Sequence, residues 1–179
     1  MDHVRPRAGC RYLGIDVTPI SLSALIALVG KAIHCDAPTI IVGHNLHSVY
    51  LYHTDSKFKN FYDSADVVLC DGAPVLWDYR FSDGSGHAER IGSTDWIPHV
   101  ACIPGLTRVG VIGASAEANR RFVSVISGLL PDARVMGIEG ANWSSDTANA
   151  AREAMRRFGP QLLLVGLGMP LQEHYVASL

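Results

Sequence analysis

The chain has 179 residues, 48% of them apolar and 18% charged, which is typical of one globular domain with a buried core and argues against a disordered segment. With 17 acidic and 15 basic residues its net charge is −2, so it lacks the basic excess of a protein that binds nucleic acid through the phosphate backbone. The first residues lack the apolar stretch of a signal peptide, and no apolar run reaches the roughly 20 residues of a membrane span, so we expect a cytoplasmic protein.

Strand and helix patterns alternate along the chain. Short runs of β-branched and other apolar residues predict the strands, the second of them buried on both faces, and apolar residues at helical spacing predict the helices. The expected strands are Tyr12–Val17, Thr39–Val42, Val67–Cys70, Thr107–Ile112, Ala133–Ile138 and Leu162–Val165. The expected helices are one after Ser21, then Asn45–Tyr52, Phe58–Tyr62, one through Trp77 to Phe81 before a polar loop Ser82–His87, Asp95 towards Cys102, Ala116–Leu130, Asp146–Phe158 and one from Leu171 onwards.

Strands separated by helices imply right-handed crossovers and a Rossmann-like α/β fold, with a mostly parallel sheet covered by helices on both faces. We expect one domain over residues 1–179, with a soft division into two lobes near Ile103–Leu106. In such sheets ligands bind beyond the carboxyl ends of the strands. Four strand ends carry glycine or polar residues: Gly43-His44-Asn45, Asp71-Gly72, Gly113-Ala114-Ser115 and Gly166-Leu167-Gly168.

Asp71 is the most informative residue, because it follows an apolar strand directly and precedes a glycine. A carboxylate at that edge accepts a proton from a nucleophilic hydroxyl or holds a ligand hydroxyl. The alternative is that Asp71 only caps the next helix. Position alone leaves both interpretations open.

The glycines at Gly113, Gly166 and Gly168 would let a ligand phosphate approach backbone amides at a helix start, or they serve the turn geometry alone. Neither the Rossmann dinucleotide fingerprint nor the P-loop pattern is present. Pro170 suits the first turn of a helix, where Gln172 and Glu173 would either cap the helix or contact a ligand.

Arg90, before Gly-Ser-Thr-Asp, is a natural partner of phosphate, although a surface salt bridge explains it as well. His44 and His47 are three residues apart, yet the sequence shows no third metal ligand near them, and Asp-x-Asp is absent. The cysteines lie in four separate segments without zinc-site spacing. We therefore expect neither a metal site nor a cofactor, and a substrate diphosphate would be met by amides and arginine.

These pieces, in this order, resemble the WecG/TagA/CpsF family of bacterial glycosyltransferases from about Thr39 to Glu173. The resemblance rests on Asn45 after the second strand, the strand and helix Val67–Trp77 around Asp-Gly, and Glu89-Arg90-Ile91 with the Gly-Ser-Thr-Asp segment. It continues with the strand that ends at Gly113. It ends with Val165-Gly166-Leu167-Gly168-Met169-Pro170-Leu171-Gln172-Glu173, which is close to the family's GxGxPxQE signature.

The resemblance implies a metal-independent, inverting transfer of a hexose or N-acetylhexosamine from a UDP-sugar to a polyprenyl-diphosphate-linked acceptor. The reaction would take place at the cytoplasmic face of the membrane, in the synthesis of cell-surface polysaccharide. The family's proposed base corresponds to Asp71, the expected catalytic residue. The expected substrate-binding residues are His44, Asn45, Gly72, Arg90, Asp95, Gly113, Gly166, Gly168, Pro170, Gln172 and Glu173.

The sequence departs from the family pattern in two ways. Many members carry Thr-x-Asn where this chain has Gly43-His44-Asn45, so His44 or His47 would replace the threonine, or the substrate differs. Members usually continue beyond the Gln-Glu signature into a basic, membrane-associating C-terminal segment, whereas this chain ends at Leu179. We expect peripheral membrane contact to depend on that segment, and its absence to favour self-association into a homo-oligomer.

Both departures leave an alternative open, in which the chain is a catalytically weak nucleotide-sugar-binding module of a polysaccharide assembly complex. That module would bind UDP without transferring sugar. A Rossmann-like oxidoreductase is a third hypothesis, which the missing dinucleotide fingerprint disfavours.

Overall fold

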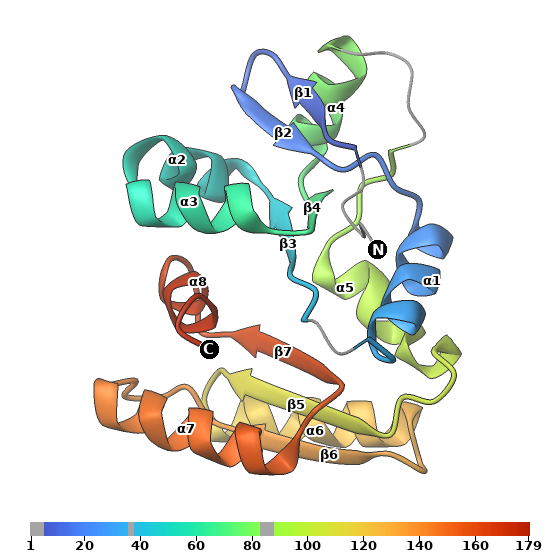
Figure 1. Ribbon diagram of the computed structural model, residues 1–179, viewed down its shortest axis with the longest axis vertical. Helices are drawn as coiled ribbons and strands as arrows, with labels where there is room; N and C mark the ends of the chain where they lie inside the picture. Colours follow the sequence, from blue (N-terminus) through green and yellow to red (C-terminus); the bar gives the residue numbers. More distant parts are fainter. Residues whose placement is uncertain (1–5, 36–37, 83–87) are drawn as a thin grey trace. The chain divides into compact units, whose positions relative to one another are not determined.

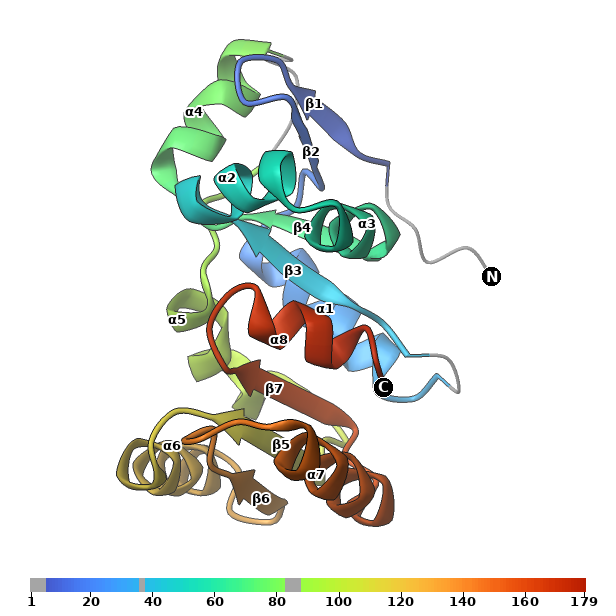
Figure 2. The ribbon, with the colours of Figure 1, turned by 90° about the vertical axis from the view of Figure 1, so that its left-hand side faces the viewer.

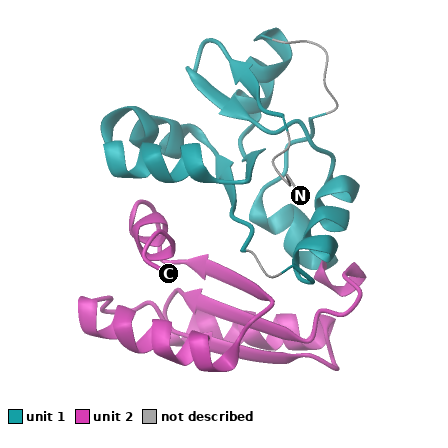
Figure 3. Cartoon of the chain, viewed as in Figure 1, with its two compact units in different colours: residues 1–99 teal, residues 100–179 magenta. Residues whose placement is uncertain are grey.

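The computed structural model describes residues 6–35, 38–82 and 88–179. The five N-terminal residues and most of the predicted polar loop, 83–87, lie outside the described residues. The chain forms two compact units, residues 1–99 and residues 100–179, coloured separately in Figure 3. The expectation of one domain with a division near Ile103–Leu106 stays a prediction.

The first unit combines two small sheets with five helices among its described residues (Figure 1). Its strands are β1 (Ala8–Cys10), β2 (Ile15–Val17), β3 (Ile41–His44) and β4 (Val67–Cys70). Its helices are α1 (Leu22–Ala32), α2 (Leu46–Thr54), α3 (Ser56–Ser64), α4 (Ala73–Ser82) and α5 (Ser93–Trp96), and a 3₁₀ segment (Ile97–Cys102) leads into the second unit. Strands β1 and β2 form an antiparallel hairpin, and β3 pairs with β4 in parallel.

The parallel pair positions the candidate site. Its register runs from Ile41 opposite Val67 to His44 opposite Cys70, so both strands end at the same edge. Helices α2 and α4 begin within three residues of those ends. Every residue of β4 is buried, so the strand belongs to the core of the unit. Figure 2 shows β3 and β4 side by side with α2 and α3 next to them.

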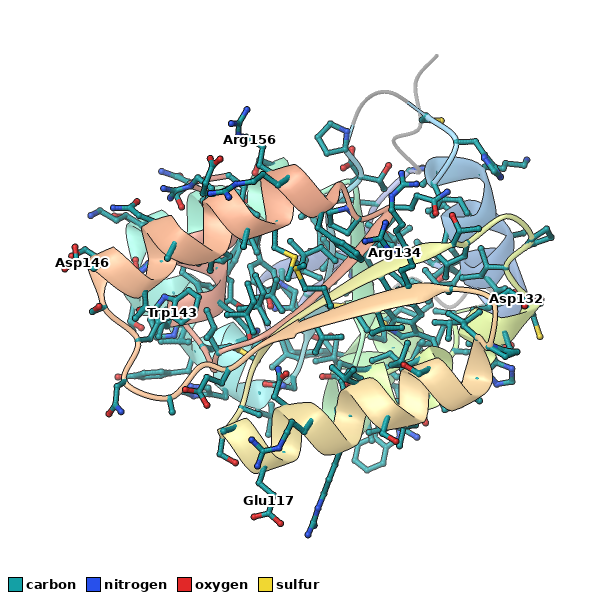
Figure 4. All side chains as sticks on the ribbon, turned by 90° about the horizontal axis from the view of Figure 1, so that it is seen from below. Glu117, Asp132, Arg134, Trp143, Asp146 and Arg156 are labelled. Atoms are coloured by element: carbon teal, nitrogen blue, oxygen red, sulfur yellow. The ribbon has the colours of Figure 1, made fainter. Side chains whose placement is uncertain are left out.

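The second unit is a three-stranded parallel sheet in the order β6-β5-β7. Its elements are β5 (Arg108–Gly113), α6 (Ala116–Leu129), β6 (Arg134–Ile138), α7 (Ser145–Phe158), β7 (Leu162–Gly166) and α8 (Leu171–Val176). Figure 4 shows α6 and α7 on opposite faces of this sheet, with Glu117 of α6 and Arg156 of α7 pointing away from it. Ile112, Ala151, Met155 and Tyr175 form the buried cluster on the α7 face. The prediction of a Rossmann-like α/β fold with parallel strands is confirmed.

Several element predictions need correction. The strand expected over Tyr12–Val17 is a hairpin turn followed by β2, because Gly14 adopts a left-handed conformation and its N–H closes the turn on Cys10. The second strand is shifted from Thr39–Val42 to Ile41–His44, and most of it is half-buried rather than buried on both faces. The helix expected from Asp95 towards Cys102 is α5 followed by the 3₁₀ segment. The parallel strands pair as β3-β4 in the first unit and as β6-β5-β7 in the second.

In the described ranges, no helix is long and apolar enough to cross a membrane.

Candidate functional site

Asp71 lies directly after β4, at the edge where β3 and β4 both end. Its backbone N–H and that of Gly72 donate hydrogen bonds of 3.0 and 3.2 Å to the carbonyl oxygen of His44. Because both N–H groups bind the same carbonyl oxygen, the chain turns sharply out of the sheet at Asp71-Gly72. The side chain of Asp71 is half-buried, so the carboxylate is neither sealed in the core nor fully solvated.

Asn45 links this carboxylate to helix α2. Its Oδ1 accepts the backbone N–H groups of His47 and Ser48 at 3.0 and 3.1 Å, which makes Asn45 the N-cap of α2. Because Oδ1 is used in this way, the Nδ2 group is the one that faces Asp71, and it donates to Oδ2 at 3.4 Å. One amide therefore caps the helix and orients the carboxylate.

The side chain of Asp71 packs directly against two glycines, Gly43 and Gly92. A Cβ atom added at Gly92 would overlap Oδ1 of Asp71, and one added at Gly43 would lie 3.0 Å from the Cβ atom of Asp71. Gly72 is also close-packed, since a Cβ there would lie 3.4 Å from the Cα of Asn45. We call these five residues, Gly43, Asn45, Asp71, Gly72 and Gly92, the Asp71 corner.

Arg90 and Asp95 lie beside the Asp71 corner. Arg90 forms a parallel bridge with Cys70, and the N–H of Ile91 donates to the Cys70 carbonyl at 2.8 Å, so this segment runs along the end of β4. The Asp95 Oδ2 atom accepts the N–H of Gly92 at 2.8 Å and lies 3.1 Å from Nη1 of Arg90. The Gly92 hydrogen bond and the Arg90 charge lower the pKa of Asp95. Arg90 is thus in a surface salt bridge, and about half of its side chain stays exposed.

His44 lies inside the unit rather than at the surface. Its ring packs 4.4 Å from the ring of Tyr62, centroid to centroid, and edge-on to Tyr52, and its Nδ1 is 3.0 Å from the hydroxyl of Ser48. Burial lowers the pKa of His44 to about 4, so the ring is neutral at pH 7. The expected substrate contact by His44 stays a prediction, and in the structure the side chain has a packing role.

His47 is exposed on α2. Among the residues that the structure describes, no group of three or more His, Cys, Asp or Glu side chains could hold a metal ion.

The second unit contains the other predicted strand-end glycines. Gly113 pairs with Gly166 across β5 and β7, and a Cβ at Gly113 would overlap the Gly166 carbonyl oxygen. Gly113 also has a φ of 128°, a conformation that favours glycine. The buried Asn119 of α6 donates to the carbonyls of Gly113 and Ile138 at 2.9 and 3.0 Å, which ties the ends of β5 and β6 together.

The segment after β7 starts helix α8. Gly168 has a φ of 83° with open space at its Cβ position, and its carbonyl accepts the N–H of Gln172 at 3.0 Å. Pro170 directly precedes α8. The side-chain amide of Gln172 donates to Glu173 Oε1 at 2.9 Å, and Glu173 is buried.

The structure thus brings Asn45, Asp71 and Gly72 together in one unit, beside Arg90 and Asp95, and pairs Gly113 with Gly166 in the other. Gly43, Gly92 and Asn119 were not predicted as site residues from the sequence. Gly92 was visible only as part of the Gly-Ser-Thr-Asp motif, and its contact with Asp71 spans 21 positions of the sequence. For Asn119 the only signal was a polar residue within an amphipathic helix.

The model of the Glycosyl transferase WecG/TagA/CpsF family matches residues 10–179. No curated protein matches the sequence significantly.

Proposed function

Since the chain belongs to the WecG/TagA/CpsF family of glycosyltransferases, we propose that it transfers a sugar from a UDP-sugar to a polyprenyl-diphosphate-linked acceptor. The transferred group is a hexose or N-acetylhexosamine, and the product serves bacterial cell-surface polysaccharide synthesis. Membership of the family supports the glycosyltransferase activity itself. The donor, the acceptor and the mechanism are our proposal.

The observation that best supports the mechanism is the half-buried Asp71 carboxylate, oriented by Asn45 at the end of β4. In a single displacement the acceptor oxygen forms a bond to the anomeric carbon while the bond from that carbon to the UDP oxygen breaks. Asp71 takes the proton of the acceptor hydroxyl, and the configuration at the anomeric carbon inverts. One carboxylate is sufficient for this role.

The departing UDP needs hydrogen-bond donors or cations to take up its negative charge. We propose Arg90 for this role in the first unit, because its guanidinium remains half-exposed beside Asp95. Arg90 acts without a metal ion in our proposal. The strand-end glycines Gly113, Gly166 and Gly168 of the second unit stay predicted substrate contacts. Gln172, Glu173 and Pro170 stay predicted substrate contacts.

The direct test supplies candidate UDP-hexoses and UDP-N-acetylhexosamines together with a short-chain prenyl-diphosphate-sugar acceptor. We expect acceptor-dependent release of UDP and a glycosylated lipid of the corresponding mass, at the same rate with and without a chelator. Loss of activity in the chelator would contradict the metal-independent mechanism. Binding of UDP in calorimetry with no product from any pair would instead support the nucleotide-sugar-binding module.

A further inference from the structure

Three large aromatic side chains are exposed near one end of the first unit. Trp77 and Phe81 of α4 are 57% and 81% exposed, and Tyr12 in the hairpin turn between β1 and β2 is 82% exposed. Two arginines, Arg11 and Arg80, are exposed beside them in the sequence. We call these five residues the aromatic surface. None of them belongs to the Asp71 corner.

The helix geometry and the hydrogen bonds of the hairpin turn place these residues together. Trp77 and Phe81 are four residues apart and Arg80 follows Trp77 by three, so all three lie on one face of α4. The opposite face packs into the unit through the buried Val75 and Tyr79.

The hairpin turn is fixed at the same end of α4. The backbone N–H of Arg11 donates to the Ser82 hydroxyl at 2.8 Å, and that of Tyr12 donates to Asp78 at 3.2 Å. Figure 1 shows the hairpin and α4 side by side.

The charge of this surface is positive. Asp78, the one carboxylate of α4, is buried, and its oxygens accept from the Leu13 N–H at 2.6 Å and the Ser82 hydroxyl at 2.7 Å. Arg11 and Arg80 form no ion pair within the described part of the chain. Asp16 of β2 is exposed, but Ile15 and Val17 on either side of it are buried, so it faces away from the packed side of the hairpin.

Tryptophan, tyrosine and arginine together are the side chains that occupy the boundary between lipid head groups and acyl chains. A protein partner with an acidic, apolar patch would use similar residues, but the aromatic surface begins one helical turn from the Asp71 corner, since α4 starts at Ala73. The positive charge of Arg11 and Arg80 complements the phosphates of an anionic bilayer. This charge, and the continuity of the aromatic surface with the Asp71 corner, favour a lipid partner.

We propose that the aromatic surface docks the chain on an anionic lipid bilayer, with Trp77, Phe81 and Tyr12 inserted at the interface and the two arginines against lipid phosphates. This would hold the Asp71 corner close to the membrane surface. The continuity argument for lipid, and the further step in which a lipid-linked acceptor meets Asp71 there, rest on the proposed function, whereas vesicle binding itself is measured without it.

Sedimentation with lipid vesicles tests the proposal. We expect binding to vesicles of phosphatidylglycerol and phosphatidylcholine in equal parts, weaker binding as salt is raised, and much weaker binding to phosphatidylcholine alone. The double substitution R11Q/R80Q should lower partitioning about 30-fold, and W77S/F81S should lower it by about tenfold or more. V125S is the matched control, because Val125 of α6 is as exposed as Trp77, and it should bind like the unchanged protein.

Circular dichroism and thermal unfolding confirm that each variant is folded. The proposal is overturned if the folded variants bind vesicles as well as the unchanged protein does. It is also overturned if W77S/F81S changes the oligomeric state in gel filtration and leaves vesicle binding unchanged, because the surface then joins two copies of the chain. UDP release with a water-soluble acceptor reports on the proposed function separately, and the vesicle variants should retain it.

Discussion

Replacing Gly92 by alanine tests whether the position of the Asp71 carboxylate matters for the reaction. The backbone of Gly92 has a φ of −98°, which alanine adopts without strain. The added methyl group would overlap Oδ1 of Asp71 and lie 3.4 Å from its Cγ and 3.5 Å from Oδ2 of Asp95. Because non-bonded heavy atoms settle about 3.5 Å apart, Oδ1 has to retreat by roughly 1 Å.

The expected effects on rate and on stability differ. A misplacement of about 1 Å at a reacting group costs about 100-fold in rate, or roughly 2.7 kcal/mol of transition-state stabilisation. The atom that must yield is the end of a half-buried side chain, so the overpacking cost should stay near the lower limit of about 1 kcal/mol. We therefore expect Gly92→Ala to lower kcat/KM by about 100-fold and to lower the free energy of unfolding by only about 1 kcal/mol.

The assay is acceptor-dependent UDP release, with thermal unfolding measured on the same samples. The control is Gly128→Ala, because a Cβ at Gly128 of α6 meets no atom within 4 Å. That variant should keep its full rate and gain up to about 1 kcal/mol of stability from the better helix propensity of alanine. A Gly92→Ala protein as active as the Gly128→Ala control would refute the reasoning.

Three further predictions concern two other residues of the first unit and one of the second. Asn45→Asp keeps the α2 cap but replaces the donor to Asp71 by a negative charge, so UDP release should fall with little change in melting temperature. Asn45→Ala removes both interactions, so UDP release should fall and the free energy of unfolding should also decrease by about 1 kcal/mol. Burial lowers the folded-state pKa of His44 from 6.5 to about 4, so the unfolded chain binds the proton more readily than the folded chain does. The free energy of unfolding should therefore fall by roughly 3 kcal/mol as the pH drops from about 6.5 to about 4. Urea unfolding of His44→Gln should show a shallower pH dependence, and an equal slope in both proteins would contradict this. Gly113→Ala should lower the free energy of unfolding, measured in urea, by about 3 kcal/mol or more, because its Cβ meets the Gly166 carbonyl rather than a movable side chain. A decrease below about 1 kcal/mol would contradict the backbone conformation described at Gly113.

Local sequence patterns predicted most of the elements that position the site. The fully apolar Val67–Cys70 is β4 with the same bounds, and the periodicity after Ser21 is α1 with Ser21 as its N-cap. A buried strand that ends at Asp-Gly placed Asp71 at the edge of the sheet without knowledge of any tertiary contact. Local rules sufficed there because strand, turn and helix start are consecutive in the chain.

The other parts depend on contacts between distant segments. Strand β1 is three residues long, too short for a periodic pattern, and is held by its pairing with β2. The approach of Gly92 to Asp71 follows from the bridge between Arg90 and Cys70, which no local pattern encodes. The burial of His44 likewise arises from the rings of Tyr52 and Tyr62 on two other elements.

The central claim is that Asp71 removes the proton from the attacking hydroxyl. The most direct measurement compares Asp71→Asn with the unchanged protein in UDP release and, by calorimetry, in UDP binding. The amide keeps the shape of the side chain but cannot act as a base, so transfer should fall by about 10²–10⁴-fold while UDP binding is retained. An Asp71→Asn protein that transfers sugar at the full rate would contradict the account.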